Sequence, residues 1–309
     1  MLTPATIPQS APPSALRRLV ARHPVAAFLV MAYTITPTFL LQTIWRPANI
    51  LPLGFSLWDS FGTIFGVALP AFLVMAALHG RAGIRDLASR SLRWRARPIW
   101  YFISLLGVPA GVILVASLIY GLAPLVALAD KSVLLFSLIL PDLLIRFVLL
   151  NLPEEVGWMG FLQSRLQDRR GPVMAVVLVE IPFALWHLPD LIVQTGGQLS
   201  LVLILFGLFT IAQLFGRVVI LWLYNNTHRS VLLVGLFHAA HNTTINRFVD
   251  EFIPGTAVTG FFITEGVVML AAVLLIIITK GRLSYKPNDA AQTADSPLAN
   301  SNGLVSDPR

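Results

Sequence analysis

The stretch 132-SVLLFSLILPDLLIRFVLLNLPEEVGWMGFLQSRL-166 decides the class of fold. It is apolar over most of its length, and it exceeds the ~20 residues that a helix needs to cross ~30 Å of hydrocarbon. Glu154 and Glu155 lie side by side in its second half. Because charged side chains are costly inside a bilayer, two carboxylates in such a segment indicate a role in function or in helix packing.

The composition of the whole chain agrees with a membrane protein. Of its 309 residues, 56% are hydrophobic and only 12% are charged, well outside the range of soluble domains. We therefore expect an all-α, polytopic membrane bundle of about eight transmembrane helices. A membrane domain over 23–282 would follow an N-terminal arm, 1–22, and precede a disordered polar tail, 283–309. The expected location is the cell membrane, as a multi-pass protein of a prokaryotic plasma membrane.

The apolar runs give approximate bounds for the spans. Helices are expected near 24–45, 52–78, 98–122, 132–166, 172–190, 199–224, 230–246 and 257–279. The fourth is too long for a simple span. Because proline removes a backbone donor and clashes with the preceding turn, Pro141 and Pro153 predict a break or kink, with a short re-entrant piece before a tilted helix.

Lys and Arg residues indicate the orientation. Most fall in the N-terminal arm, the 81–97 loop, the 165–170 turn, at Arg229 and in 280–286, whereas the opposite side has only Arg46, Lys131 and Arg247. By the positive-inside rule, both termini are expected in the cytoplasm. The net charge of +7 then reflects orientation, and it does not predict a nucleic-acid partner. The expected partners are the bilayer and a membrane-associated protein or peptide substrate.

Several kinds of catalytic site are absent from the sequence. The chain has no cysteine, which excludes disulfides and thiolate chemistry. It contains no HExxH zinc helix and no Gly-x-Ser-x-Gly elbow. Paired aspartates of the intramembrane aspartyl type are also missing. A catalytic site in this chain must therefore work with glutamate and histidine.

Polar residues from three predicted helices fall at similar depth in the membrane. Glu154 lies fifteen residues before the start of the 169–171 turn, and His187 lies sixteen residues after its end. At 1.5 Å per residue, both are ~22–24 Å from that turn. His238 and Asn242 share a helix face and lie ~13–20 Å from the same membrane side. The depths predict one site built from a carboxylate, two imidazoles and a carboxamide.

Such a set of side chains supports hydrolysis of an acyl bond in two ways. A carboxylate can accept a proton from water, with help from a neutral imidazole, while a second imidazole and an amide donate hydrogen bonds to an oxyanion. Alternatively, Glu154, His187 and His238 could bind a metal, since carboxylate and imidazole are ordinary zinc ligands. The cofactor is therefore zinc or none. A polar network that only orders the bundle is the remaining alternative.

At these residues the sequence resembles the CPBP family of intramembrane proteases, also called the CAAX-protease and bacteriocin-processing or ABI family. The family has EExxxR, FxxxH and HxxxN motifs on successive membrane helices. The corresponding segments are 154-EEVGWM-159, 183-FALWH-187 and 238-HAAHN-242. The resemblance covers a motif core of about 140–246. Eukaryotic members trim the last three residues from prenylated CAAX proteins, and many bacterial members mature peptides or confer bacteriocin immunity.

The resemblance implies catalytic roles for four residues. Glu154 would activate the water together with His187, and His238 and Asn242 would stabilise the oxyanion. Glu155 would support them. The family has been described both as metalloproteases and as metal-free, glutamate-dependent proteases, which leaves both mechanisms open here.

One position departs from the family pattern, because Met159 stands where the motif has arginine. That arginine would lie one turn from Glu155 and pair with it. Glu155 must therefore find another cation, Arg217 or Arg146, or be protonated. Glu180 shares a face with His187 and is expected either to support the site or to pack helices together.

Three functions remain open from the sequence. The first is an intramembrane endopeptidase that cuts a membrane-associated protein or peptide, by CAAX-type processing or by peptide maturation. The second, motivated by Met159, is a non-catalytic immunity or interaction protein on the same scaffold. The third is a proton-coupled transporter that uses the buried carboxylates, although the motifs have no special reason to occur in a transporter.

Overall fold

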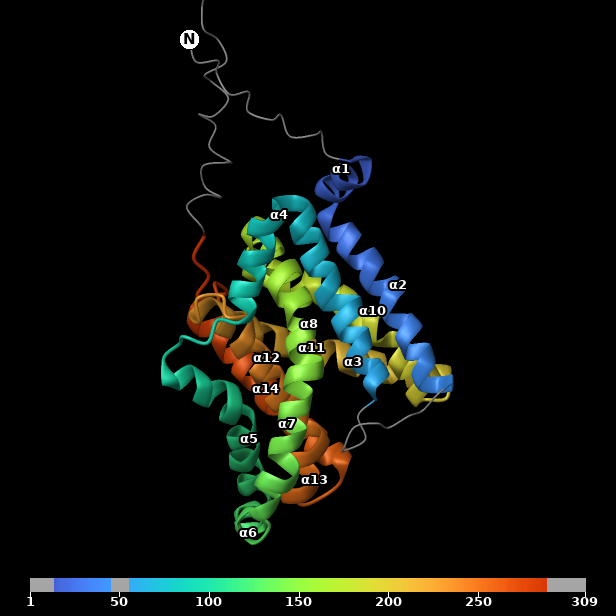
Figure 1. Ribbon diagram of the computed structural model, residues 1–309. Coiled ribbons are helices and arrows are strands. Elements are labelled where there is room, and N and C mark those ends of the chain that lie inside the picture. The colour runs from blue at the N-terminus through green and yellow to red at the C-terminus, as the bar shows by residue number, and fades with distance from the viewer. Residues whose placement is uncertain (1–13, 46–55, 288–309) are drawn as a thin grey trace, which may run out of the picture.

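The computed structural model describes residues 14–45 and 56–287, and this part of the chain contains helices and no strands (Figure 1). The α-helices are α1 (Ala15–Arg22), α2 (Pro24–Trp45), α3 (Leu57–Thr63), α4 (Leu69–Ser91), α5 (Pro98–Tyr120), α6 (Ala123–Asp130), α7 (Leu140–Arg146), α8 (Leu152–Glu155), α9 (Ser164–Arg170), α10 (Pro172–Gln194), α11 (Leu199–Asn226), α12 (Val231–Thr243), α13 (Val249–Phe252) and α14 (Ala257–Thr279). Between them lie π-helical segments: η2 (Ile64–Ala68), η3 (Leu135–Ile139), η4 (Phe147–Asn151), η5 (Val156–Gln163) and η6 (Thr244–Phe248).

Seven helical stretches in the described part are long and apolar enough to cross a membrane. They are Pro24–Leu41, Leu57–Ser91, Pro98–Tyr120, Leu135–Arg170, Pro172–Gln194, Leu199–Asn226 and Ala257–Thr279. The remaining predicted span, 230–246, corresponds to α12 and the start of η6, which form a shorter and more polar helix. Most side chains of α12 are buried, because the helix lies inside the bundle against its neighbours. The protein is therefore a multi-pass helical membrane protein.

The second span extends further than the sequence indicates. The helix runs through α3, η2 and α4 to Ser91, and it includes much of 81–97, the segment predicted as a loop. It bends at Gly80, whose φ of 59° and ψ of −141° lie outside the helical region. Glycine adopts this positive φ without steric cost, so the helix resumes after the bend. Residues 52–55, at the expected start of this span, and Arg46 lie outside the described residues.

The long segment that carries the two glutamates does not break at its prolines. It runs as one helical stretch, Leu135–Arg170, and no separate re-entrant piece forms within it. Pro141 lies just after η3, and Pro153 lies just after η4. The wider turns of a π-helix relieve the clash between a proline ring and the preceding turn. They also change which residues share a face, which a period of 3.6 cannot predict.

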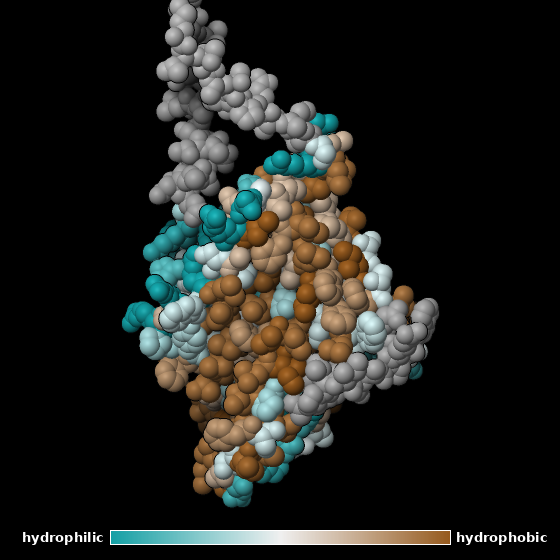
Figure 2. Space-filling model, viewed as in Figure 1, coloured by the Kyte–Doolittle hydropathy of each residue, from teal (hydrophilic) through white to brown (hydrophobic). Residues whose placement is uncertain are grey.

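Polar contacts join several connections at one end of the bundle. Hydrophilic side chains gather at the end of the molecule where α1 and the end of α4 lie, above a broad hydrophobic band (Figure 2). Asp168 accepts hydrogen bonds from Arg229 at 2.9 Å and from the Tyr285 hydroxyl at 3.0 Å. Burial raises the pKa of Tyr285 to about 12, so this hydroxyl remains a neutral donor.

The start of the predicted C-terminal tail packs against the bundle. Asn225 donates to the Leu283 carbonyl at 3.0 Å, and the Leu283 side chain is buried. Order therefore continues past 282, the expected end of the membrane domain. The rest of the predicted tail, 288–309, lies outside the described residues.

A cluster of aromatic side chains fixes the helices around the motif segment. Trp158 is fully buried in η5. Its ring centroid lies 5.5 Å from that of Phe28, 5.4 Å from that of Phe183 and 5.9 Å from that of Trp186. Edge-to-face pairs at these separations are favourable. The cluster joins α2 and α10 to the helix that follows Glu154.

Candidate active site

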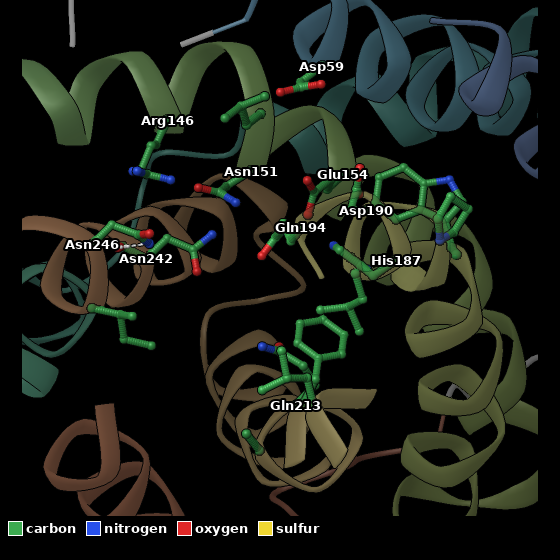
Figure 3. Close-up of a pocket in the computed structure, with 18 of the residues that line it drawn as sticks. Asp59, Arg146, Asn151, Glu154, His187, Asp190, Gln194, Gln213, Asn242 and Asn246 are labelled. Carbon is green, nitrogen blue, oxygen red and sulfur yellow. Dashed lines mark hydrogen bonds between the residues drawn. The ribbon is translucent and has the colours of Figure 1, made fainter. Parts of the chain in front are cut away.

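A cavity of about 860 Å³ lies beside the segment that carries the glutamates. Glu154 from α8, His187 from α10 and Asn242 from α12 all line it (Figure 3). Three of the four predicted catalytic residues therefore meet at one cavity. Its wall also contains apolar side chains from α11 and α14, which are Leu205, Leu208, Phe209, Phe261 and Phe262.

Glu154 and Glu155 point in different directions, as their adjacent positions on a helix require. The Glu154 side chain is buried from bulk solvent and points into the cavity (Figure 3). Its Oε2 atom lies 4.0 Å from Nδ1 of His238. Glu155 is fully buried and does not line the cavity. Glu154 is therefore the carboxylate of the pair that can meet a substrate.

His187 is held in a ring of aromatic side chains. Its ring centroid lies 4.5 Å from that of Phe183, 4.6 Å from that of Trp186 and 4.9 Å from that of Phe209. Its Nδ1 atom lies 3.1 Å from the Phe183 carbonyl oxygen, so Nδ1–H is the donor in this contact. The neutral imidazole then has its acceptor lone pair on Nε2, and a ring nitrogen points toward Glu154 (Figure 3).

His238 lies behind the cavity wall and is not among the residues that line it. It is buried, and its Nδ1 atom lies 2.9 Å from Oε1 of Glu155. Because Glu155 also accepts hydrogen bonds from Arg217, its oxygens act as acceptors and His238 donates through Nδ1–H. Glu155 therefore fixes the ring of His238 close to Glu154.

Arg217 of α11 is the cation that contacts Glu155. Its Nη1 atom donates to Oε2 and Oε1 of Glu155 at 2.9 and 3.2 Å, and its Nε atom donates to Glu180 at 3.4 Å. Its guanidinium carbon also lies 4.7 Å from the centroid of the Phe183 ring. Phe183 also contacts His187, and Glu155 contacts His238. Arg217 therefore contacts a neighbour of each histidine. Glu180 contacts the same arginine and thus belongs to this buried network.

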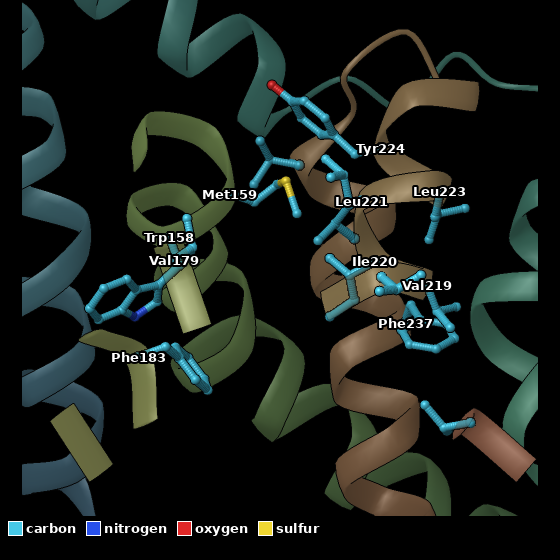
Figure 4. Close-up of a cluster of buried hydrophobic side chains, with 14 of the residues drawn as sticks. Trp158, Met159, Val179, Phe183, Val219, Ile220, Leu221, Leu223, Tyr224 and Phe237 are labelled. Atoms are coloured by element: carbon cyan, nitrogen blue, oxygen red, sulfur yellow. The ribbon is translucent and has the colours of Figure 1, made fainter. Parts of the chain in front are cut away.

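Met159 occupies the position of the missing motif arginine, and its side chain is fully buried. It belongs to the same buried hydrophobic cluster as Leu221 and Tyr224 of α11 (Figure 4). Leu221 lies one turn after Arg217, so α11 presents the guanidinium and this apolar side chain from the same face. The other candidate partner of Glu155, Arg146, instead donates to Asp142 at 2.7 Å.

The predicted metal ligands do not form a metal site in this geometry. No group of three or more His, Asp and Glu side chains within 14–45 and 56–287 has an arrangement that could hold a metal ion. His238 is turned toward Glu155 and does not line the cavity with Glu154 and His187. Nδ1 of His238 is engaged by Glu155, and Nδ1 of His187 by the Phe183 carbonyl, so Nε2 is the ring nitrogen of each histidine that could bind a metal.

Two asparagines in the cavity wall were missed by sequence reasoning. Asn151 lies just before Glu154 on the same helix, and its side chain lines the cavity. Asn246 follows Asn242 by one turn, and its side chain donates to the Asn242 carbonyl at 2.7 Å. Asn151 lies about one turn before Glu154, and Asn246 lies about one turn after Asn242. This spacing is the signal in the sequence that could have identified both asparagines.

Further carboxylates also line the cavity, and they come from four helices. Asp59 lies in α3, Asp190 in α10, Asp250 in α13 and Glu265 in α14. Glu265 accepts a hydrogen bond from Nε2 of His241 at 3.1 Å. None of these carboxylates belongs to the three motif segments, so the family resemblance could not identify them.

Comparison with known proteins shows where this chain has relatives. Residues 134–244 match the family described as Rce1-like, type II CAAX prenyl endopeptidase. The matched segment includes the three motif segments. The resemblance to the CPBP family is confirmed. CAAX prenyl protease 2 of Methanococcus maripaludis is 29% identical over 130 residues.

That similarity is limited to part of each protein. It covers 41% of this chain and 46% of the Methanococcus protein, so the match spans about half the length of that relative. All four predicted catalytic residues and Arg217 fall within the residues that match the family. Glu265 of α14 falls outside them.

Proposed function

We propose that this protein is an intramembrane endopeptidase of the CAAX-processing type, which hydrolyses a peptide bond in a membrane-associated protein or peptide. The observation that carries the proposal is the meeting of Glu154, His187 and Asn242 at one cavity, with His238 held beside Glu154. The match to the Rce1-like family over 134–244 supports the same class of reaction.

In this proposal Glu154 is the general base. Its carboxylate takes one proton from a water molecule, while Nε2 of His187 accepts a hydrogen bond from the other and orients that water. The water oxygen attacks the scissile carbonyl carbon and forms a tetrahedral intermediate. When the carbon–nitrogen bond breaks, Glu154 gives its proton to the leaving amine.

Asn242 and His238 stabilise the negative charge that develops on the carbonyl oxygen. The Asn242 side chain lines the cavity directly. His238 requires a small movement, because it lies behind the wall, where Glu155 fixes its orientation. Arg217 supports the site by holding Glu155 in place. In this proposal the water is activated by the side chains of Glu154 and His187, which both line the cavity.

The test is cleavage of a lipidated CAAX peptide by the protein in proteoliposomes. Glu154→Gln and His187→Ala should each lower kcat by about 10²- to 10⁴-fold, the usual contribution of general acid–base catalysis. Glu265→Gln is the matched control, because Glu265 is another carboxylate that lines the same cavity. Cleavage that survives both Glu154→Gln and His187→Ala would overturn the assignment.

The alternative of a non-catalytic immunity or interaction protein is motivated by Met159. Arg217 provides a cation for Glu155 from another helix. The absence of the motif arginine therefore does not favour a role without catalysis. Partner binding that persists in Glu154→Gln, with no cleavage by the wild type, would restore that alternative.

A further inference from the structure

One face of the long helix presents three polar side chains to the cavity in a line. Arg146, Asn151 and Glu154 all line it, and Figure 3 shows them in this order along a single helix. Glu154 follows Arg146 by eight positions, which corresponds to at most ~12 Å along the axis, because the wider turns of η4 lie between them. The cavity therefore extends beyond the proposed catalytic base toward a guanidinium.

The opposite wall continues the same polar line. Asn242 and Asn246 also line the cavity, and they face Arg146 and Asn151 in Figure 3. A peptide that lies between the two helices would thus meet amide groups on both sides. Amides donate and accept hydrogen bonds, as a peptide backbone requires.

Charge distinguishes the end of this line from the rest of the cavity. Among the lining residues that the structure describes, Arg146 is the one arginine or lysine. A negatively charged group on a ligand would be attracted near Arg146 and repelled by the carboxylates elsewhere in the wall. These carboxylates are Asp59, Glu154, Asp190, Asp250 and Glu265.

Contacts outside the cavity hold the Arg146 guanidinium in place. Its Nε atom donates to Oδ2 of Asp142 at 2.7 Å. Asp142 is fully buried and also accepts hydrogen bonds from Arg247 at 3.0 Å and Thr243 at 2.8 Å. A guanidinium has five N–H donors, and the contact with Asp142 uses the one on Nε.

We propose that Arg146 binds the free C-terminal carboxylate of the substrate, about three residues beyond the bond that is cut. An extended peptide spans ~3.3 Å per residue, so three residues reach ~10 Å from the scissile carbonyl. This length lies within the limit of ~12 Å between Arg146 and Glu154 along the helix. The inference rests on the proposed endopeptidase function and adds the residue that recognises the end of the substrate.

The test compares two lipidated peptides of one sequence, one with a free C-terminal carboxylate and one with a C-terminal amide. The wild type should cleave the acid about 10- to 100-fold faster in kcat/KM, because a hydrogen-bonded charge pair contributes that much to recognition. In Arg146→Gln this preference should fall to about one, through slower cleavage of the acid alone. Arg146→Lys should keep part of the preference.

Arg247→Gln is the matched control. Arg247 donates to the same Asp142 carboxylate but is not among the residues that line the cavity. It should retain the preference for the acid. Equal loss of the preference in Arg247→Gln and Arg146→Gln would overturn direct binding by Arg146.

The wild type alone already separates the possible outcomes. Equal cleavage of the acid and the amide would overturn the carboxylate site while leaving the endopeptidase function intact. Failure to cleave either peptide would contradict the endopeptidase function itself. Because this comparison needs no substitution, it does not depend on whether Arg146→Gln folds.

Discussion

The buried Glu155 carboxylate receives its cation from α11, whereas the family motif would provide an arginine from the glutamate's own helix. Nη1 of Arg217 lies 2.9 Å from Glu155, and Met159 is buried at the motif position. Arg217→Met should lower activity by about 10- to 100-fold, since it leaves two buried carboxylates without their cation. If the cation is what matters, adding Met159→Arg should restore much of the activity. The measurement is kcat/KM of the single and double variants. If kcat/KM of the double variant is no higher than that of Arg217→Met, Arg217 does not take the place of the motif arginine.

At the residue scale the sequence is informative for Glu154, His187 and Asn242, because depth along each helix depends only on residue number and rise. It could not place His238 behind the cavity wall. That position depends on Glu155, which Arg217 holds from a third helix. Contacts among three helices are not encoded in the spacing of any one of them.

At the scale of helical elements, a glycine in the motif helix allows η5 and η2 to pack closely. Gly157 of η5 faces Val67 of η2, and a Cβ atom at Gly157 would lie 2.5 Å from the Val67 Cγ1 atom and 3.0 Å from its carbonyl oxygen. Gly157→Ala should therefore destabilise the protein by about 1–3 kcal/mol, the usual cost of overpacking. Gly207→Ala on α11 is the control, because a Cβ atom there meets nothing within 4 Å. Thermal unfolding in detergent measures both, and equal stability of the two variants would contradict the close packing.

Proline positions predict where this helix is irregular but not the form of the irregularity. Pro141 and Pro153 follow η3 and η4, and the helix continues through both. The sequence shows that each proline lacks the backbone N–H that a regular helix would use. Whether a chain then breaks or widens by one residue depends on tertiary packing, which a single sequence does not contain.

At the scale of the whole molecule, the distribution of basic residues predicts the orientation in the membrane. Arg95 and Asp250 are exposed and belong to opposite groups of connections. The chain has no cysteine, so Arg95→Cys and Asp250→Cys each introduce a unique thiol. A membrane-impermeant thiol reagent should label Asp250→Cys in intact cells and Arg95→Cys only after permeabilisation. The reverse pattern would place the basic end outside.

The most direct measurement of the central claim follows the oxygen of the attacking water. A lipidated CAAX peptide is incubated with the reconstituted protein in heavy-oxygen water, and the products are analysed by mass spectrometry. The wild type and Glu265→Gln should produce one cut, with heavy oxygen in the new C-terminal carboxylate, and Glu154→Gln should leave nearly all of the peptide uncut over the same time. Cleavage by Glu154→Gln at the wild-type rate would contradict the assignment of Glu154 as the base.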